Sequence, residues 1–326
     1  MKTILVTGAT GCLGSNLVNA LLSRDYHVRA FRRERSSLLA LNGLDVEHFI
    51  GDVCDTSSLR RAMEGCDTVF HAAALVSFWS KKYQEQYETN VQGTRNVVDA
   101  CLDLGVGKLI HTSSVAALGY RTDAQLIDET TEYNWGRSIG YRYTKHLAEL
   151  EVLRGVSKGL HAVILNPSII IGQRDVYVHG GVIVREIKRG RIPVYLHGGM
   201  NVVSVHDVVS GHLAAAERGR AGERYILAGT NFTHKEVFDL AAKVTGGRAP
   251  NVRIPVRLVQ IIARISDMVA GLWGKQPWIS PDLLSGAGRN QWYSVSKAER
   301  ELEFHPSLIE GAMREAYEWY RQHGMV

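Results

Sequence analysis

Residues 3–14 read TILVTGATGCLG, and this stretch decides the fold. The apolar residues at its start predict a strand at Ile4–Val6, and apolar residues at helical spacing follow the glycines from Leu17 onward. A glycine-rich turn between a first strand and a first helix is typical of a phosphate-binding loop, because the turn aims the N-terminus of the helix at an anion. The sequence therefore predicts a nucleotide site at its first strand-helix junction.

The three glycines of this loop have separate roles in such a site. Gly8 allows the tight turn, Gly11 lets the backbone approach a pyrophosphate, and Gly14 permits close packing of helix on strand. The spacing departs from the G-x-G-x-x-G form, since Thr10 stands where that form has its middle glycine. The residues of the loop that we expect to contact the cofactor are Gly8, Thr10, Gly11, Cys12, Leu13 and Gly14.

Short β-rich runs alternate with helical patterns in the first half of the chain, which is typical of repeated βαβ units. We therefore predict an α/β fold, namely a Rossmann-type doubly wound parallel sheet with a smaller C-terminal substrate-binding lobe. The dinucleotide-binding domain is expected over residues 1–171, with about 200–228 returning to it, and the lobe mainly over 172–326. The predicted elements are strands at Ile4–Val6, His27–Phe31, Val46–Ile50, Thr68–His71, Lys108–Thr112 and His161–Asn166, and helices including Asn90–Leu104 and Tyr141–Arg154.

The composition indicates a globular protein. Of 326 residues, 45% are hydrophobic and 22% are charged, which excludes a disordered or fibrous chain. The net charge of +5 comes from scattered basic residues without a long run interleaved with aromatics, so we predict no nucleic-acid partner. No apolar signal core precedes the first strand, and we expect a cytoplasmic protein.

The cysteines argue against a metal-binding protein, and the longest apolar stretch argues against a membrane-spanning protein. The four cysteines form no C-x-x-C pair and no zinc spacing, so we expect reduced thiols and predict no metal site. The longest apolar stretch, about Val256 to Trp273, is interrupted by charged side chains and is too broken for a membrane span. We interpret it as an amphipathic helix packed on the protein rather than a helix on a membrane surface.

Tyr141 and Lys145 are the candidate catalytic pair. They are four residues apart on a predicted helix and share one face, whereas Tyr143 points elsewhere. An ammonium group beside a phenol lowers the pKa of the phenol, which can then exchange a proton with a substrate oxygen. Ser114 follows a predicted strand and can hold that oxygen by a hydrogen bond, with Ser113 as the rival for this role.

The end of the second predicted strand indicates which cofactor is used. A Rossmann protein that prefers NAD usually has Asp or Glu there to bind the ribose hydroxyls. Arg32 occupies that position in this chain and Arg33 follows it, and a guanidinium suits a 2′-phosphate. Glu34 is the residue that argues for NAD. We predict NADP(H) as the cofactor, with NAD(H) as the less favoured alternative.

A series of ordered motifs resembles those of the extended short-chain dehydrogenase/reductases. The glycine loop is followed by Gly51-Asp52-Val53, His71-Ala72-Ala73-Ala74, Asn90-Val91-Gln92-Gly93-Thr94, Thr112-Ser113-Ser114, Tyr141-Arg142-Tyr143-Thr144-Lys145 and Asn166-Pro167-Ser168. The similarity continues through 205–209 and 296–302, so it covers essentially the whole chain. Within this family the pattern is nearest to the dihydroflavonol 4-reductase-like and hopanoid-associated sugar-epimerase-like proteins.

The resemblance implies positions for the remaining cofactor contacts. Asp52 and Val53 are expected near the adenine, residues 72–74 along the ribose, and Asn90 near the nicotinamide side. Asp52 has the alternative role of capping the following helix. The full set that the resemblance adds is Asp52, Val53, Ala72, Ala73, Ala74, Asn90, Thr112, Pro167 and Ser168. The candidate substrate contacts, each with core packing as the alternative, are Ser77, Phe78, Trp79, Tyr177, Tyr195 and His197.

These residues lead to one main hypothesis and two alternatives. The main hypothesis is reduction of a ketone or aldehyde by NADPH, with Tyr141 as proton donor, Lys145 as its activator and ribose contact, and Ser114 as the group that positions the carbonyl. The alternatives are a sugar or sugar-nucleotide 4-epimerase that retains NAD, and a non-catalytic NADP(H)-sensing protein. The expected partner is a small-molecule carbonyl or alcohol substrate, and a homodimer is left open.

Overall fold

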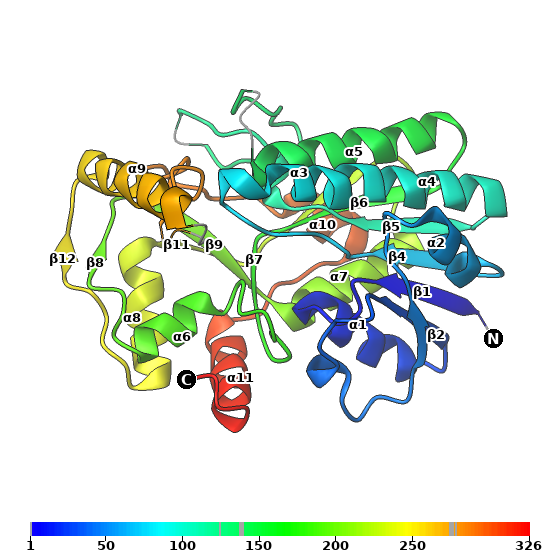
Figure 1. Ribbon diagram of the computed structural model, residues 1–326, viewed down its shortest axis with the longest axis horizontal. Coiled ribbons are helices and arrows are strands. Elements are labelled where there is room, and N and C mark those ends of the chain that lie inside the picture. Colours follow the sequence, from blue (N-terminus) through cyan, green and yellow to red (C-terminus); the bar gives the residue numbers. More distant parts are fainter. Residues whose placement is uncertain (1, 124, 137–139, 274–276, 278) are drawn as a thin grey trace.

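The structure is a computed structural model that describes residues 2–123, 125–136, 140–273, 277 and 279–326. At its centre these residues form a parallel sheet of seven strands (Figure 1). The strands are β1 (Thr3–Thr7), β2 (His27–Arg32), β3 (Glu47–Ile50), β4 (Thr68–His71), β5 (Lys108–Thr112), β6 (Ala162–Pro167) and β10 (Arg224–Leu227). Their order is β10-β6-β5-β4-β1-β2-β3, which confirms the predicted Rossmann-type fold.

Helices cover both faces of this sheet (Figure 1). One face packs against α1 (Cys12–Leu22), α7 (Val205–Arg218) and α10 (Ser296–Leu302). The other face packs against α2 (Thr56–Met63), α4 (Gly93–Leu104) and α5 (Tyr141–Ser157). A parallel sheet needs this cover, because apolar strand residues point to both of its faces.

The segment before α4 is helical for longer than the sequence predicts. A 3-10 turn, η2 (Ser80–Lys82), leads into α3 (Tyr83–Gln86) and then into η3 (Tyr87–Gln92), which has π-helical hydrogen bonding, and α4 follows without a break. Such π-helical turns occur frequently at functional sites. The helix ends at Gly105, whose φ of +67° is the left-handed conformation that glycine adopts at helix C-termini.

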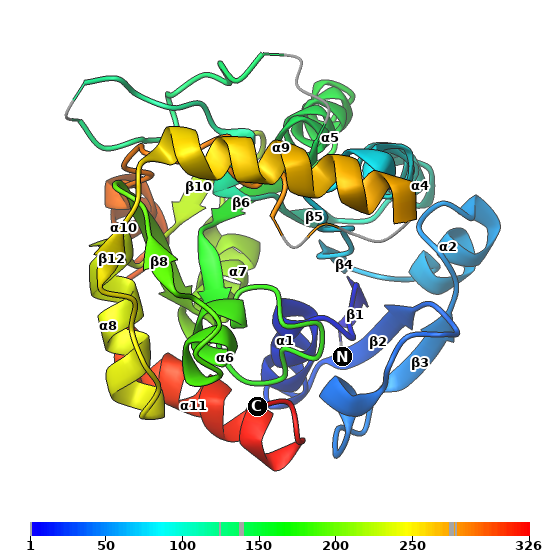
Figure 2. The same ribbon diagram turned by 60° about the vertical axis from the view of Figure 1, so that its left-hand side comes forward.

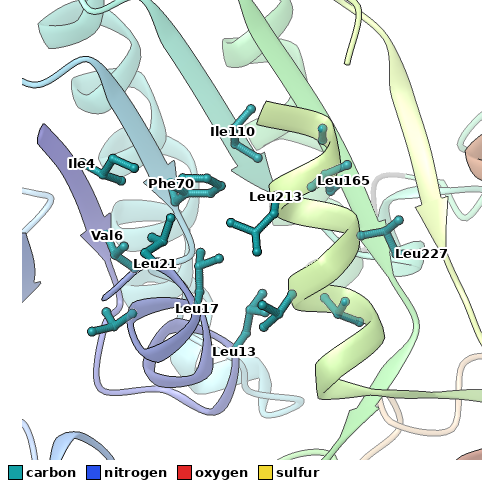
Figure 3. Close-up of a cluster of buried hydrophobic side chains, with 14 of the residues drawn as sticks. Ile4, Val6, Leu13, Leu17, Leu21, Phe70, Ile110, Leu165, Leu213 and Leu227 are labelled. Carbon is teal, nitrogen blue, oxygen red and sulfur yellow. The ribbon is translucent and has the colours of Figure 1, made fainter. Parts of the chain in front are cut away.

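The core between the sheet and α1 shows why the sequence pattern specifies this fold. Leu17 and Leu21 lie one turn apart on α1 and are both buried against the sheet (Figure 3). Leu213 of α7 approaches the same core from the neighbouring helix, and Leu227 of β10 lies on the far side of α7 (Figure 3). Each fully buried leucine stabilises the fold by about 1.5–3 kcal/mol.

Most of the elements from β7 onward form a second group beside the main sheet. A small sheet contains β7 (Ile169–Ile171), β9 (Gly199–Ser204) and β11 (Thr230–Thr233), and a short pair contains β8 (Val194–Tyr195) and β12 (Val252–Arg253). Helices α6 (Val182–Lys188), α8 (His234–Thr245) and α11 (Ile309–Gln322) pack together around a separate apolar core. Between these elements the chain returns to the main sheet, where β10 pairs with β6 and α7 packs on one face. Two 3-10 turns, η1 (Leu39–Leu41) and η4 (Val115–Ala117), complete the elements.

Helix α9 (Val256–Trp273) packs on the protein, as its sequence predicts, but through few of its apolar residues. It crosses the outside of the molecule (Figure 2). Its inner side packs through Val259 and Ala263 against Leu284 and its neighbours. Its outer side, however, leaves large apolar side chains exposed, with Leu272 82% exposed. The predicted packing is therefore confirmed for Val259 and Ala263, whereas most of the large apolar side chains of α9 are exposed.

Candidate active site

A cavity of about 660 Å³ opens at the carboxyl ends of the parallel strands. Its walls include the glycine loop, the residues that end β2, β4, β5 and β6, and the first turn of α5. The strand order reverses between β1 and β4, and ligands of doubly wound sheets bind at such a reversal. With the exception of Asn90, every residue that the sequence predicts as catalytic or cofactor-binding lines this cavity.

The glycine loop fits a dinucleotide pyrophosphate. A Cβ atom on Gly8 would lie 2.7 Å from the backbone nitrogen of Ala73, and one on Gly14 would lie 2.2 Å from the carbonyl oxygen of Gly8. Helix α1 begins after Gly11 with no side-chain cap and no acidic residue in its first turn, as far as the described residues go. The first N–H groups of α1 are therefore available to bind an anion. The backbone around Gly8 and Gly14 is too close to accommodate a larger residue at either position.

Asn90 does not line the cavity, although its partner Leu75 does. Its Oδ1 accepts a hydrogen bond from the backbone N–H of Leu75 at 2.8 Å, and its Nδ2 donates to the Leu75 carbonyl and to Thr144 Oγ1, both at 3.1 Å. The side chain is buried behind the cavity wall and does not line it. Asn90 ties the cavity-lining Leu75 segment to α5, and its position near the nicotinamide stays a prediction.

Tyr141 and Lys145 lie one turn apart at the start of α5, and both line the cavity. Lys145 Nζ donates a hydrogen bond to the Thr112 carbonyl at the end of β5, at 2.8 Å. Burial lowers the pKa of Lys145 to about 8, against the opposing charge of Glu149. The ammonium form therefore predominates at neutral pH, although it is held in a poorly solvated position.

The pKa of Tyr141 corrects the sequence-based expectation. Burial raises this pKa to about 12, and the groups that oppose the rise are Ser114, through a hydrogen bond, and Arg142, through its charge. Lys145 is not among them, and its ammonium group is directed to the Thr112 carbonyl. The phenol of the free protein is thus a protonated group at neutral pH, suited to donating a proton.

The two serines after β5 have different partners. Ser113 Oγ donates its hydrogen to Glu149 Oε1 at 2.5 Å, and Glu149 is fully buried and also pairs with Arg224. Ser114 Oγ accepts from the backbone N–H of Ala116 at 3.1 Å and is hydrogen-bonded to the Tyr141 phenol. Ser114 is the serine placed to share a substrate oxygen with Tyr141, since the hydroxyl hydrogen of Ser113 is already used.

Two buried histidines lie beneath Lys145. Burial, reinforced by the charge of Lys145, lowers the pKa of His71 to about 3 and the pKa of His111 well below its ordinary value. His71 Nδ1 is within hydrogen-bonding distance of Thr7 Oγ1, at 2.8 Å. Both imidazoles are therefore neutral at pH 7, and Lys145 carries the positive charge of this group.

Arg32 and Arg33 line the cavity at the end of β2, together with Ser36, which the sequence reasoning missed. Arg32 Nε donates to His48 Nδ1 at 3.3 Å and its Nη1 donates to the Arg33 carbonyl at 3.4 Å, and the Arg32 side chain is partly exposed while Arg33 is exposed. Glu34 is exposed and does not line the cavity. The residue that argued for NAD thus lies outside the cavity lining, whereas both arginines border the cavity.

Asp52 is a cavity residue rather than a helix cap. Its Oδ1 accepts from the backbone N–H of Cys54 at 2.9 Å, and the side chain that caps α2 belongs to Asp55. The alternative role considered for Asp52 is therefore wrong. Cys12 also lines the cavity, and like the other three cysteines it is a free thiol. Burial raises the pKa of its thiol well above the ordinary value, so Cys12 is a poor nucleophile.

The wall opposite the glycine loop is largely apolar. The Phe78 ring meets the Tyr141 ring edge-on at 5.8 Å between centroids. Of the candidate substrate contacts, Phe78 and Tyr177 line the cavity and the other four do not, and of those four Ser77 and Trp79 are buried. The apolar and aromatic side chains of this wall that the sequence reasoning missed include Leu196, Met200, Leu283, Leu284 and Tyr293.

Arg142 is a further cavity residue that sequence reasoning missed. Its guanidinium carbon lies 4.4 Å from the centroid of the Trp135 ring, and it donates hydrogen bonds to Ser285 and Gln291. No local motif could reveal this, because the two hydrogen-bond partners come from the last fifth of the chain. Within the described residues, no group of three or more His, Cys, Asp or Glu side chains is placed to hold a metal ion.

The parallel sheet, its glycine loop and the cavity at the strand ends define a Rossmann-type dinucleotide-binding protein. The model of the NAD dependent epimerase/dehydratase family matches residues 4–228, and the chain belongs to this family. This confirms the resemblance to the extended short-chain dehydrogenase/reductases, which are enzymes that use a nicotinamide dinucleotide.

Similar proteins match the chain over almost its full length. A protein named putative dihydroflavonol 4-reductase, from Synechocystis sp., is 36% identical over 98% of this chain and 95% of its own. Sterol demethylase protein B from Methylococcus capsulatus is 35% identical over 99% of this chain and 100% of its own. The crystal structure of gox2253 is 36% identical and covers 100% of both chains with a TM-score of 0.87.

Proposed function

We propose that this protein is an NADP(H)-dependent oxidoreductase that reduces a ketone or aldehyde, with Tyr141 as the general acid. The observation that carries the proposal is the convergence of Tyr141, Ser114 and Lys145 in the cavity that also contains the glycine loop. Such residues move a proton to or from an oxygen. A carbonyl that accepts a hydride at carbon needs this proton at its oxygen. The division into a dinucleotide-binding domain over 1–171 and a substrate lobe over most of 172–326 remains part of the proposal.

The reaction follows from these side chains. Ser114 donates a hydrogen bond to the carbonyl oxygen of the substrate, and Tyr141 transfers its phenolic proton to that oxygen as the carbonyl carbon becomes tetrahedral. The bound cofactor supplies the hydride that the carbon receives. The charge of Arg142, which opposes the rise of the Tyr141 pKa, stabilises the phenolate that remains. Lys145 lies one turn away on the same helix face and is expected to contact the ribose of the cofactor. Thr112 holds Lys145 in place through its carbonyl.

We propose an apolar ring compound as the substrate. Apolar surface predominates in the cavity lining, and the Phe78 and Tyr141 rings meet edge-on within it. Pockets of this kind bind by shape and burial, with a few polar groups that fix orientation. The two relatives named for a dihydroflavonol and a sterol support this class, since both names denote compounds with fused rings.

Replacing Arg32 with Asp should reverse or abolish a preference for NADPH. A hydrogen bond to a charged group contributes about 1.5–3 kcal/mol, and each 1.4 kcal/mol is about a tenfold change in affinity. The wild type should therefore bind NADPH at least about tenfold more tightly than NADH. In the variant, the carboxylate repels a 2′-phosphate and accepts hydrogen bonds from an unmodified ribose. Fluorescence titration with both reduced cofactors at fixed ionic strength measures the ratio.

Two further variants make this titration decisive. Arg33→Ala tests the neighbouring guanidinium, which also lines the cavity. Glu34→Gln is the matched control, because Glu34 lies outside the cavity lining and its loss should leave the ratio unchanged. Equal binding of NADH and NADPH by the wild type would refute the assignment of NADP(H). Tightly held NAD that copurifies with the protein would favour the alternative of a 4-epimerase that retains its cofactor.

The pH dependence of the two reaction directions should differ. The pKa of Tyr141 is raised to about 12, so the phenol stays protonated through neutral pH and can serve reduction without a change of state. Oxidation of the alcohol needs the phenolate, so its rate should rise about tenfold per pH unit. Reduction should stay level and then fall above pH 8, as Lys145 with its pKa of about 8 loses its proton. Initial rates in both directions test this, and a level oxidation rate contradicts it.

A further inference from the structure

The outer face of α9 is a continuous apolar surface. Its exposed apolar residues recur at intervals of three and four, so they line up along one side of the helix. We call this set the α9 stripe, and it consists of Leu258, Ile261, Ile262, Ile265, Met268, Val269, Leu272 and Trp273. Singly exposed apolar residues are ordinary, whereas a contiguous row of them marks an interaction surface.

The inner face of α9 is fully accounted for by the fold. Val259 and Ala263 are buried and pack with Leu284 in a small apolar cluster. At the C-terminal end, Lys81 donates a hydrogen bond to the Gly271 carbonyl at 2.7 Å, which fixes that end of the helix to the rest of the protein. The α9 stripe therefore lies on the outer side of a helix whose inner side is fixed to the protein. Figure 2 shows α9 crossing the outside of the molecule.

Two arginines border the α9 stripe along one edge. Arg257 and Arg264 each precede a stripe residue by four positions, namely Ile261 and Met268, so the guanidinium groups lie beside the same edge of the stripe. Both are exposed, and neither forms an ion pair within the described part of the chain. Helix α9 contains one acidic residue, Asp267, which lies three residues beyond Arg264 and is only partly exposed.

We propose that the α9 stripe docks the protein on the surface of an anionic lipid bilayer. An apolar helix face bordered by arginines, with tryptophan at one end, has the chemistry of a helix that lies in the interface plane. The arginines meet the phosphates while the stripe enters the acyl boundary. In the part of the chain that the structure describes, no helix is long and apolar enough to cross a membrane, so α9 docks on the bilayer without spanning it.

Charge distinguishes a bilayer from a second copy of this chain. Two copies that paired their α9 stripes would bring basic edges into the same interface, and α9 offers no exposed acidic residue at the opposite edge to pair with Arg257 or Arg264. An anionic bilayer supplies the missing negative charge at every position along the edge. The net charge of +5 acts in the same direction.

The position of α9 connects the bilayer to the cavity. Leu284 packs under α9 and also lines the cavity, and its neighbour Leu283 lines the cavity while remaining 44% exposed. A docked protein would therefore hold this apolar side of the cavity beside the lipid. Docking does not depend on the proposed reaction, and the experiment that tests it uses no substrate and no cofactor.

Cosedimentation with vesicles tests the proposal on the full-length protein. The wild type should bind phosphatidylcholine vesicles that contain phosphatidylglycerol, and bind pure phosphatidylcholine vesicles more weakly. The double variant I261S/I265S should lower the affinity about a hundredfold, about tenfold for each large apolar side chain withheld from the acyl region. The double variant R257Q/R264Q should lower affinity for the anionic vesicles about fivefold per arginine, and added salt should reproduce this loss.

The matched control is Leu308→Ser. Leu308 is 87% exposed but lies at the start of α11, outside the α9 stripe, so its replacement should leave vesicle binding unchanged. All the substituted side chains are exposed, and unaltered thermal unfolding confirms that the variants fold. Failure of the wild type to sediment with anionic vesicles overturns the proposal, as does I261S/I265S binding like the wild type. A wild-type dimer that I261S/I265S dissociates, without vesicle binding, assigns the stripe to a second copy and also overturns it.

Discussion

Tyr141→Phe should lower turnover by roughly a hundredfold to ten-thousandfold, which is the usual contribution of a positioned general acid. The Phe ring keeps the edge contact with Phe78 and removes only the hydroxyl that is hydrogen-bonded to Ser114. Cofactor affinity should change little, because the phosphates are expected at the glycine loop. Steady-state rates with an identified ketone substrate, together with cofactor titration, measure the two effects separately.

Tyr143→Phe is the matched control for this experiment. Tyr143 lies on the same helix two residues further on, and its ring approaches Tyr133 at 6.1 Å rather than the cavity. The control variant should turn over like the wild type. If Tyr141→Phe also turned over like the wild type, the catalytic assignment would be wrong. An equal loss in both variants would instead indicate general damage to α5.

Lys145→Met should abolish most activity and yet stabilise the protein. Burial lowers the pKa of Lys145 to about 8. Keeping this ammonium charged in the fold at pH 7 costs on the order of 3 kcal/mol relative to the unfolded chain, where the pKa is about 10.4. Methionine fits a similar volume without a charge. The lost hydrogen bond to Thr112 offsets about 1 kcal/mol of the gain.

The pH dependence of unfolding identifies the origin of this gain. Because the folded pKa lies below the unfolded one, the unfolded state binds more protons between about pH 8 and 10.4, and the stability of the wild type rises with pH across that window. The difference between variant and wild type should therefore shrink as pH rises through it. Denaturant unfolding of both proteins at pH 7 and above measures this. A variant less stable than the wild type at every pH would show that Lys145 has a structural role.

The fold was predictable because local patterns agree with the global arrangement. The strand at 4–6, the glycine turn and the helix from Leu17 each carry their own signal, and every later strand of the first half repeats the pattern. The exposure of most apolar residues of α9 escaped prediction for a physical reason. Hydrophobic periodicity shows that a helix has an apolar face, but it does not show whether the protein itself has a surface to cover that face.

The candidate site was predictable where it depends on spacing and was missed where it depends on distant contacts. Tyr141 and Lys145 share a helix face by spacing alone. The side-chain amide of Asn90 forms hydrogen bonds with the backbone of Leu75, and no local pattern indicates this contact. The direction of the Tyr141 pKa shift also escaped prediction, because burial is a property of the whole fold and outweighs nearby charges.

The late arrival of α7 and β10 has a consequence for how the chain folds during its synthesis. Leu17 and Leu21 emerge early from the ribosome, but Leu213 and Leu227, which complete the same core, follow only after the intervening segment has been translated. At about 5–20 residues per second, the first six strands of the sheet wait several seconds with one apolar face covered only in part, by α1. Over that interval the nascent chain exposes an apolar surface that favours aggregation, until α7 docks.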